Sequence, residues 1–161
     1  MEALDPNNYL LTQEGIDWQQ CLSTWQHRLP NTFTIWIVNR FGDLFMIYED
    51  GSLHHLDVQL GTITKRADTK AEFLNKLTEE NNATDWLYMD YVDLANTAEL
   101  KLKPGECYTF KLPPVLSGEY TRENLCTTQL DKNYAFLADV HQQIKDLPED
   151  STLQLATPEE A

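Results

Sequence analysis

Residues 42–77 are the part of the sequence that most restricts the fold. Two strand-like runs flank Asp50-Gly51, and this dipeptide favours a two-residue type I′ turn because both central residues need positive φ. Gly61 can end the second run, and Ile63 continues a short third strand. The stretch therefore predicts an antiparallel meander. Its first two strands are predicted over Leu44–Tyr48 and Ser52–Val58.

An amphipathic helix is predicted directly after the meander. Phe73 and Leu77 lie four residues apart, on one helical face, with Leu74 beside them. Asp68 precedes this run, and an aspartate at this place can accept hydrogen bonds from the free amides of the first turn. Asp68 is therefore predicted as the N-cap.

The remaining segments predict helices and strands on both sides of the meander. Apolar spacing predicts a first helix over 13–29 and a final helix after an Asp131 cap. The region 83–97 is typical of a helix, although its apolar and acidic faces are not cleanly separated. Strands are predicted over 33–39, 107–112 and 125–130, and the stripe of the final helix is Tyr134, Leu137, Val140 and Ile144, with Pro148 ending it.

The length of 161 residues predicts a single domain over 1–161, with flexible ends at about 1–8 and 156–161. Such a domain can bury a normal core without a disulfide or a metal. The predicted fold class is α+β. In it a mainly antiparallel sheet, a meander from residue 33 to residue 66, packs against several helices.

The net charge of −14 comes from 26 acidic residues against 12 lysines and arginines. It argues against nucleic acid as a ligand, because phosphate binding needs a basic surface, and it disfavours anionic membranes. A basic protein partner would be attracted by such a field. Solubility alone also explains an acidic composition.

Three cysteines without a C-x-x-C pair are most simply explained as reduced thiols in a cytoplasm. The N-terminal residues show no basic region with a long apolar run, and no stretch approaches the roughly 18 apolar residues of a membrane span. A cytoplasmic protein is therefore predicted. Phosphate-binding glycine loops and nucleophile motifs do not occur in the sequence, so no cofactor is predicted.

One polar group in the meander could carry chemistry. His54 and His55 point to opposite faces of a strand and cannot both bind one ion, but His55 and Asp57 share a face, and Asp43 lies across the hairpin. These three side chains, with His141 as a further candidate, could serve a hydrolase or hold a divalent cation. The favoured interpretation is a solvated strand face without a metal, since no further histidine is close in sequence.

The charge distribution is more suggestive than this polar group. No lysine or arginine occurs between Lys76 and Lys101, and acidic and aromatic residues are interleaved there, which suits the binding of a basic protein. In the alternative interpretation the rings face the core while the acids are solvated. The predicted partner-binding residues are Asp85, Trp86, Tyr88, Asp90, Tyr91 and Asp93.

The run from Leu102 to Asn124 resembles the C-terminal domain of immunity proteins against DNase effectors of type VI secretion. The similarity rests on Pro104-Gly105, Cys107-Tyr108, Lys111, Pro113-Pro114-Val115-Leu116, Gly118, Tyr120 and Glu123-Asn124. It extends upstream through Gly42–Phe45, Asp50-Gly51 and Leu56-Asp57, and downstream through His141 and Ile144–Pro148. The order of predicted strands, turns and helix over residues 42–77 is more loosely similar to the SMI1/KNR4-like immunity superfamily.

The resemblance implies a bacterial immunity domain with a characteristic loop. The residues of this loop are Pro113, Pro114, Gly118, Glu119, Tyr120, Glu123 and Asn124; the polar ones can either satisfy turn amides or meet a partner. Ser117 stands where the family pattern implies a second glycine, which restricts the backbone if positive φ is needed there. Proteins of this type carry an additional N-terminal domain, for which 161 residues leave no room.

Three hypotheses for the function follow. The first is a non-catalytic, immunity-type protein that binds a toxin, such as a basic nuclease effector, and occludes it through an acidic surface. The second is a hydrolase or metal-dependent enzyme that uses the group around Asp43, His55 and Asp57. The third is a stand-alone scaffold or regulatory domain, and the sequence leaves the oligomeric state open.

Overall fold

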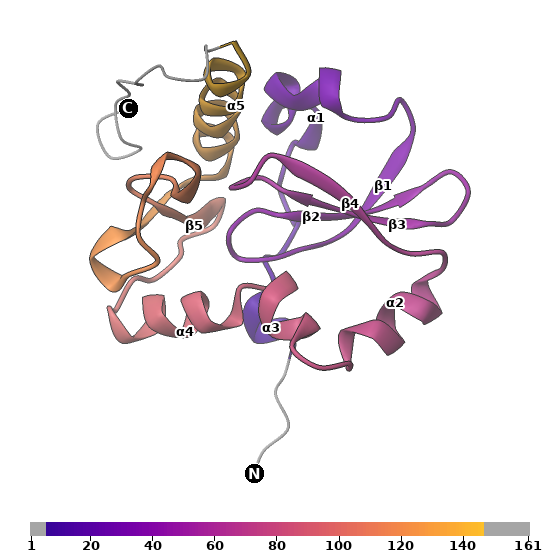
Figure 1. Ribbon diagram of the computed structural model, residues 1–161, viewed down its shortest axis with the longest axis horizontal. Coiled ribbons are helices and arrows are strands. Elements are labelled where there is room, and N and C mark those ends of the chain that lie inside the picture. Colours follow the sequence, from indigo (N-terminus) through magenta and orange to yellow (C-terminus); the bar gives the residue numbers. More distant parts are fainter. Residues whose placement is uncertain (1–5, 147–161) are drawn as a thin grey trace.

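A four-stranded antiparallel sheet lies at the centre of the computed structural model, which describes residues 6–146 (Figure 1). Its strands follow the chain in the order β1-β2-β3-β4, so the meander predicted from residue 33 to residue 66 is confirmed. The strand bounds are β1 Phe33–Val38, β2 Leu44–Tyr48, β3 Leu53–Asp57 and β4 Thr62–Ala67. A separate antiparallel pair joins β5 (Glu106–Phe110) to β6 (Leu125–Gln129).

The turn between β2 and β3 differs from the predicted type I′ turn. Gly51 has a φ of 88°, but Asp50 is not among the described residues with positive φ. The amide of Tyr48 donates to the carbonyl of Ser52, so the connection has three residues with the glycine last, a common alternative to the two-residue turn. Asp50 instead accepts hydrogen bonds from the amide and hydroxyl of Ser52.

The helix predicted over 13–29 is broken into two short pieces, α1 (Trp18–Cys21) and the 3-10 helix η2 (Ser23–Arg28). The region 83–97 is likewise divided, into α3 (Asn82–Trp86) and α4 (Met89–Thr97), because Tyr88 adopts a left-handed φ of 52°. Residues 6–8, expected to belong to a flexible end, start the 3-10 helix η1 (Pro6–Tyr9). The expected flexible positions 1–5 and 156–161 lie outside the described residues.

Two helix starts differ from the prediction. Helix α2 (Lys70–Leu77) is capped by Thr69, whose side chain accepts from the amide of Glu72, while Asp68 pairs with Lys65. Helix α5 (Leu130–Asp146) begins one residue before Asp131, which lies in its first turn. Pro148, the predicted terminator of α5, is outside the described part.

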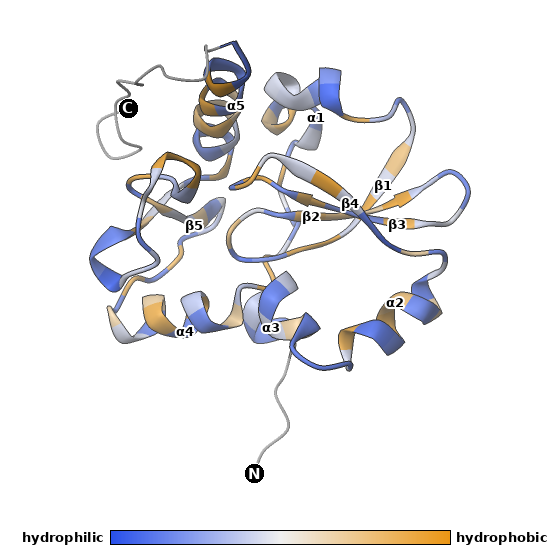
Figure 2. Cartoon of the chain, in the orientation of Figure 1, coloured by the Kyte–Doolittle hydropathy of each residue, from blue (hydrophilic) through white to orange (hydrophobic). Residues whose placement is uncertain are grey.

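The two faces of the sheet carry separate hydrophobic clusters, and Figure 2 shows hydrophobic residues in the strands and on the helices around them. On one face α1, η2 and α5 pack on Leu44, Met46 and Leu56. On the other, α2, α3 and α4 pack on Phe45 and Leu53. Three residues of the predicted α5 stripe, Tyr134, Leu137 and Val140, are buried, while Ile144 is exposed.

Candidate functional site

The loop between β1 and β2 is built around the buried side chain of Asn39. Its Oδ1 accepts hydrogen bonds from the amides of Phe41 and Asp43, both at 3.0 Å, and its Nδ2 donates to the carbonyl of Trp86 at 2.9 Å. One side chain therefore folds the loop and joins it to α3. An asparagine at the start of a Gly-containing turn is a known signal for this arrangement, but Asn39 was not among the predicted site residues.

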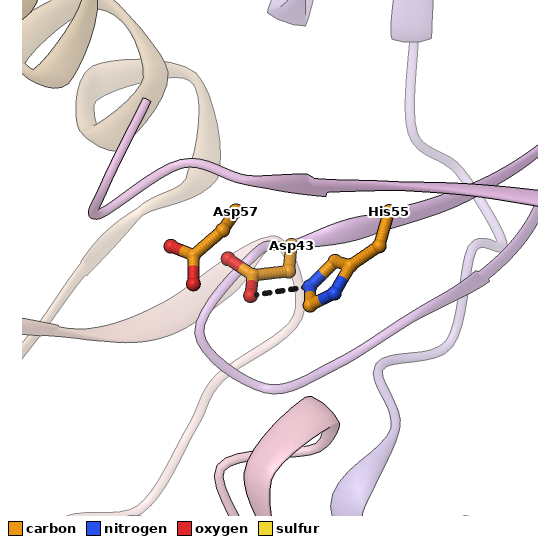
Figure 3. A group of neighbouring side chains, drawn as sticks. All are labelled: Asp43, His55 and Asp57. Atoms are coloured by element: carbon orange, nitrogen blue, oxygen red, sulfur yellow. Dashed lines mark hydrogen bonds and ion pairs between the residues drawn. The ribbon is translucent and has the colours of Figure 1, made fainter. Parts of the chain in front are cut away.

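Asp43 and His55 meet inside the protein, as Figure 3 shows. His55 Nε2 lies 3.0 Å from Asp43 Oδ2, and the amide of Val58 donates to Asp43 Oδ1 at 3.1 Å. Arg66 reaches the other ring nitrogen of His55, with Nε at 3.2 Å and the terminal nitrogen at 3.0 Å from Nδ1. A guanidinium can only donate, so Nδ1 is the acceptor, and the His55 proton resides on Nε2 and is donated to Asp43.

Asp57 completes the cluster on its half-buried side. The hydroxyl of Tyr88 donates to Asp57 Oδ2 at 3.0 Å, and the amide of Leu60 donates to Oδ1 at 3.0 Å. One ligand atom from each of Asp43, His55 and Asp57 lies within 4.8 Å of the others. The three residues that the sequence placed on one face are thus brought together.

Burial dominates the electrostatics of this cluster. It raises the pKa of Asp43 to about 7 and that of Asp57 to about 6, and it lowers the pKa of His55 to about 3. Burial also lowers the pKa of Arg66, while Asp57 and Asp43 oppose this effect. A neutral histidine therefore lies between the carboxyl group of Asp43 and the guanidinium of Arg66. The Arg66 guanidinium also lies over the Trp86 ring, 4.8 Å from its centre.

The favoured interpretation of a solvated strand face was wrong. Asp43 is 0% and His55 is 2% exposed, and the hydrogen-bond partners described above occupy both nitrogens of His55. A cation in this cluster would compete with Arg66 for Nδ1 and with the proton on Nε2, so the donor set does not suit a metal. Asp43 has no exposed surface, so a substrate cannot contact it in this conformation. Its hydrogen bonds to His55 and to the amide of Val58 hold the surrounding segments together.

His141 does not join this cluster. It lies in α5, where its Nε2 donates to the carbonyl of Val58 at 2.8 Å and its ring meets that of Trp25 edge-on at 5.8 Å. Burial lowers its pKa. Only 7% of the residue is exposed, so His141 is a buried histidine that joins α5 to the loop after β3.

The raised pKa of Asp43 predicts that the free energy of unfolding depends on pH. In the unfolded chain an aspartate titrates near ~4, so the proton bound with a pKa of about 7 stabilises the fold fully below pH ~4 and is lost as the pH rises through 7. Asp43→Asn cannot bind this proton. The unfolding free energy of the wild type, measured in urea, should gain on the order of 2 kcal/mol over that of the variant between pH 8 and pH 5.

Asp50→Asn is the control for this measurement. Hydrogen bonds from Ser52 lower the pKa of Asp50, so its carboxyl is ionised in both states between pH 8 and pH 5. The difference in stability between the wild type and this variant should not change over that range. An equally flat difference for Asp43→Asn would contradict the assignment of a raised pKa.

The predicted partner-binding residues differ in how far they are exposed. Asp85, Asp90 and Asp93 are exposed, whereas Trp86 and Tyr88 are 9% and 7% exposed and belong to the core. These two rings are therefore not free to act as surface anchors. Tyr91 is half-buried, and its ring contacts that of Tyr120, a residue of the predicted family-motif loop.

The family-motif loop supplies an exposed aromatic side chain next to Tyr91. Tyr120 is 45% exposed, and its ring centre lies 5.0 Å from that of Tyr91 and 5.2 Å from that of Phe110. Glu119 and Glu123 are exposed on the same loop. An aromatic pair thus lies at the surface where the loop meets α4, and the loop also carries two exposed glutamates and the exposed Arg122, which donates to the carbonyl of Thr97.

Asn124 holds this loop closed. Its side chain accepts from the amide of Leu112 at 2.9 Å and donates to the carbonyls of Leu112 and Glu119 at 2.9 and 2.7 Å. Gly118 lies against the chain at Leu112, where a Cβ would be 1.7 Å from the carbonyl oxygen. Pro113 and Pro114 lead into the short 3-10 helix η3 (Pro114–Leu116). Asn124 therefore satisfies backbone groups of the loop.

Ser117 ends η3 in the left-handed region, with a φ of 72°. A side chain in this conformation costs about 1 kcal/mol relative to glycine. Ser117→Gly is therefore expected to raise the unfolding free energy by roughly 0.5 kcal/mol, because the gain is partly offset by the greater freedom of glycine in the unfolded chain. Ser117→Ala, measured alongside in urea, should give no such gain.

The protein has an α+β fold. Its polar cluster around Asp43 and His55 is buried, whereas the acidic residues Asp85, Asp90 and Asp93 are exposed. Residues 67–141 match the family described as T6SS immunity protein Tdi1, C-terminal. The resemblance noted from the sequence is confirmed over this range, which contains the loop and α4. The upstream elements at Gly42–Phe45, Asp50-Gly51 and Leu56-Asp57 fall outside the match.

The other comparisons are weaker. The crystal structure of Atu4351 from Agrobacterium tumefaciens is similar with a TM-score of 0.42 and 19% identity, covering 66% of this chain. The chain spans about half of that structure (53%). A similarity at this level supports no conclusion about the fold family or the function of this chain. No curated protein matches the chain. Among the helices within residues 6–146, none is long and apolar enough to cross a membrane.

Proposed function

We propose that this chain is an immunity-type protein that binds a toxin of a type VI secretion system and neutralises it by covering its working surface. The match of residues 67–141 to an immunity family carries the proposal. The protein acts in the cytoplasm, performs no chemistry itself and needs no nucleic acid. Its partner is a basic effector such as a nuclease.

The surface that suits such a partner combines α3, α4 and the family-motif loop. Asp85 and Asp90 are exposed acids of α3 and α4, and Tyr91 and Tyr120 form the adjoining aromatic pair. An acidic surface accelerates the approach of a basic partner. A partly exposed tyrosine pair offers contact area and cation–π stacking to arginine. Asp93 is also exposed, and it accepts a hydrogen bond from Tyr9, which joins α4 to the N-terminal segment.

Charge reversal tests this surface in cells that express a toxic nuclease effector of a type VI secretion system together with this chain. The wild-type chain should restore growth, and Asp85→Lys/Asp90→Lys should abolish the protection. The urea midpoint should fall only slightly, because both side chains are exposed but lie in the first turns of α3 and α4. Binding should weaken by at least about tenfold, as expected for like charges at an interface.

The matched control is Glu14→Lys/Glu49→Lys. It makes the same change of charge at two exposed acids outside residues 67–141. Protection that survives in the control and is lost in the α3–α4 variant would support the acidic surface. Equal protection by both variants would refute it, and failure of the wild-type chain to protect would contradict the immunity role.

A further inference from the structure

A pocket of about 430 Å³ lies between the N-terminal segment and the connection from α4 to β5, within the size range of sites for small molecules. Among the described residues that line it, Arg40, Lys101 and Lys103 are basic and only Glu106 is acidic. The whole chain has the opposite balance, with 26 acidic residues against 12 lysines and arginines. The pocket therefore offers a local positive charge to an anion, on a protein that otherwise repels anions.

The positive charge of this pocket is not cancelled by ion pairs. Within residues 6–146 no salt bridge includes Arg40, Lys101 or Lys103. The carboxylate of Glu106 is engaged with the backbone, because its Oε1 accepts a hydrogen bond from the amide of Lys103 at 2.8 Å. Both lysines are exposed, and their flexible stems let the ammonium groups turn toward a bound anion.

Arg40 is half-buried and is held at the pocket by its backbone. Its amide donates to the carbonyl of Tyr9, and its carbonyl accepts from the amide of Tyr108. Of the five N–H groups of a guanidinium, the one on Nε donates to the carbonyl of Leu10 at 3.4 Å. Burial raises the pKa of Tyr108, and the adjacent Arg40 opposes this effect. The guanidinium still has donors for a bidentate contact to a carboxylate or phosphate.

Apolar side chains supply much of the remaining lining. They come from the N-terminal segment, from the connection between α4 and β5, and from the start of α5, and they are Leu10, Leu11, Ile16, Leu100, Leu102 and Leu130. A hydrated inorganic ion gains nothing from such walls, whereas an apolar body in contact with them is removed from water. The lining therefore favours an anion that carries an apolar group over a simple inorganic anion.

We propose that this pocket binds a small amphiphilic anion, an apolar body that carries one carboxylate or phosphate group. The anionic group pairs with the guanidinium of Arg40, which matches the two oxygens of such a group with parallel N–H donors. The apolar body lies against the leucines of the lining. Lys101 and Lys103 add attraction from the solvent side, and their alkyl stems can cover the bound ligand.

The test is an NMR titration of the full chain with octanoate, octyl phosphate, octan-1-ol and inorganic phosphate. At least one octyl anion should shift the backbone amides of residues 100–106 to saturation, and the tighter of the two identifies the anionic group. It should bind at least about tenfold more tightly than octan-1-ol or inorganic phosphate, which each lack one of the two features. Arg40→Gln should weaken this binding at least about tenfold, and Lys101→Gln/Lys103→Gln should weaken it about two- to fivefold.

Lys70→Gln/Lys145→Gln is the matched control, because it removes the same charge at two exposed lysines that are not part of the described lining. It should bind the octyl anions as the wild type does. Equal weakening by this control and by Lys101→Gln/Lys103→Gln would overturn the proposal, and this comparison decides even if Arg40→Gln does not fold. Binding of octan-1-ol or inorganic phosphate as tight as that of the octyl anions would also overturn it. The proposal does not depend on the immunity role.

Discussion

Asn39→Ala is expected to lower the free energy of unfolding by about 3 kcal/mol or more. The substitution leaves the buried amides of Phe41 and Asp43 without their acceptor and the carbonyl of Trp86 without its donor. Each unsatisfied buried group costs about 1–3 kcal/mol. Because the loop also carries Asp43, its loosening would extend to the hydrogen bond between Asp43 and His55.

Urea denaturation of the two proteins measures this loss directly. Asn75→Ala serves as the control, since Asn75 is exposed and its substitution should change stability by less than about 0.5 kcal/mol. Asn39→Asp keeps an acceptor for the two amides but loses the donor to Trp86 and adds a charge beside Asp43, so it should also be destabilised. A loss below about 1 kcal/mol for Asn39→Ala would contradict the role assigned to this side chain.

Gly118→Ala is the second substitution with a large expected effect. The new methyl group would lie 1.7 Å from the carbonyl oxygen of Leu112 and 2.9 Å from the carbonyl carbon of Pro113, so the loop must open. Opening separates Asn124 from Leu112 and moves Tyr120 away from Tyr91. We expect a loss of about 2 kcal/mol or more, visible in urea and as altered NMR signals of residues 112–124.

Gly15→Ala separates this contact from backbone effects. Gly15 has a φ of 79°, but no atom lies within 4 Å of a Cβ built there, so the control carries only the cost of a left-handed side chain, about 1 kcal/mol. A loss for Gly118→Ala no larger than that of the control would show that the loop adapts without opening. If the loop contributes to toxin binding, Gly118→Ala should also weaken protection, whereas Gly15→Ala should not.

The strands of the meander could be predicted closely because turn residues bound short runs rich in apolar and aromatic side chains. The run Leu44–Tyr48 was predicted with the bounds that the structure has. The type of the turn between β2 and β3 could not be predicted, since Asp-Gly also fits a three-residue connection in which only the glycine has positive φ. The prediction of one helix over 13–29 was wrong for a different reason. The spacing of apolar residues there is also compatible with short 3-10 and α segments packed on the same core.

The cluster around Asp43 shows what sequence can predict about a site. The shared face of His55 and Asp57 follows from strand alternation, and it was confirmed. Burial was not foreseen, because it depends on Trp86 and Tyr88, which come from a distant segment and cover this face of the sheet. Arg66 was missed as well, although it lies only two residues beyond Thr64, the partner of His55 across the strands.

The family match begins at Ala67, at the end of β4, but the structure has no boundary there. The stripe of α5 packs on side chains of β2 and β3, and the loop before β2 bonds to Trp86 of α3. The matched segment is therefore not a separate packing unit in this protein. Residues 67–141 on their own would lack strands β1, β2 and β3 and would leave the apolar stripe of α5 uncovered.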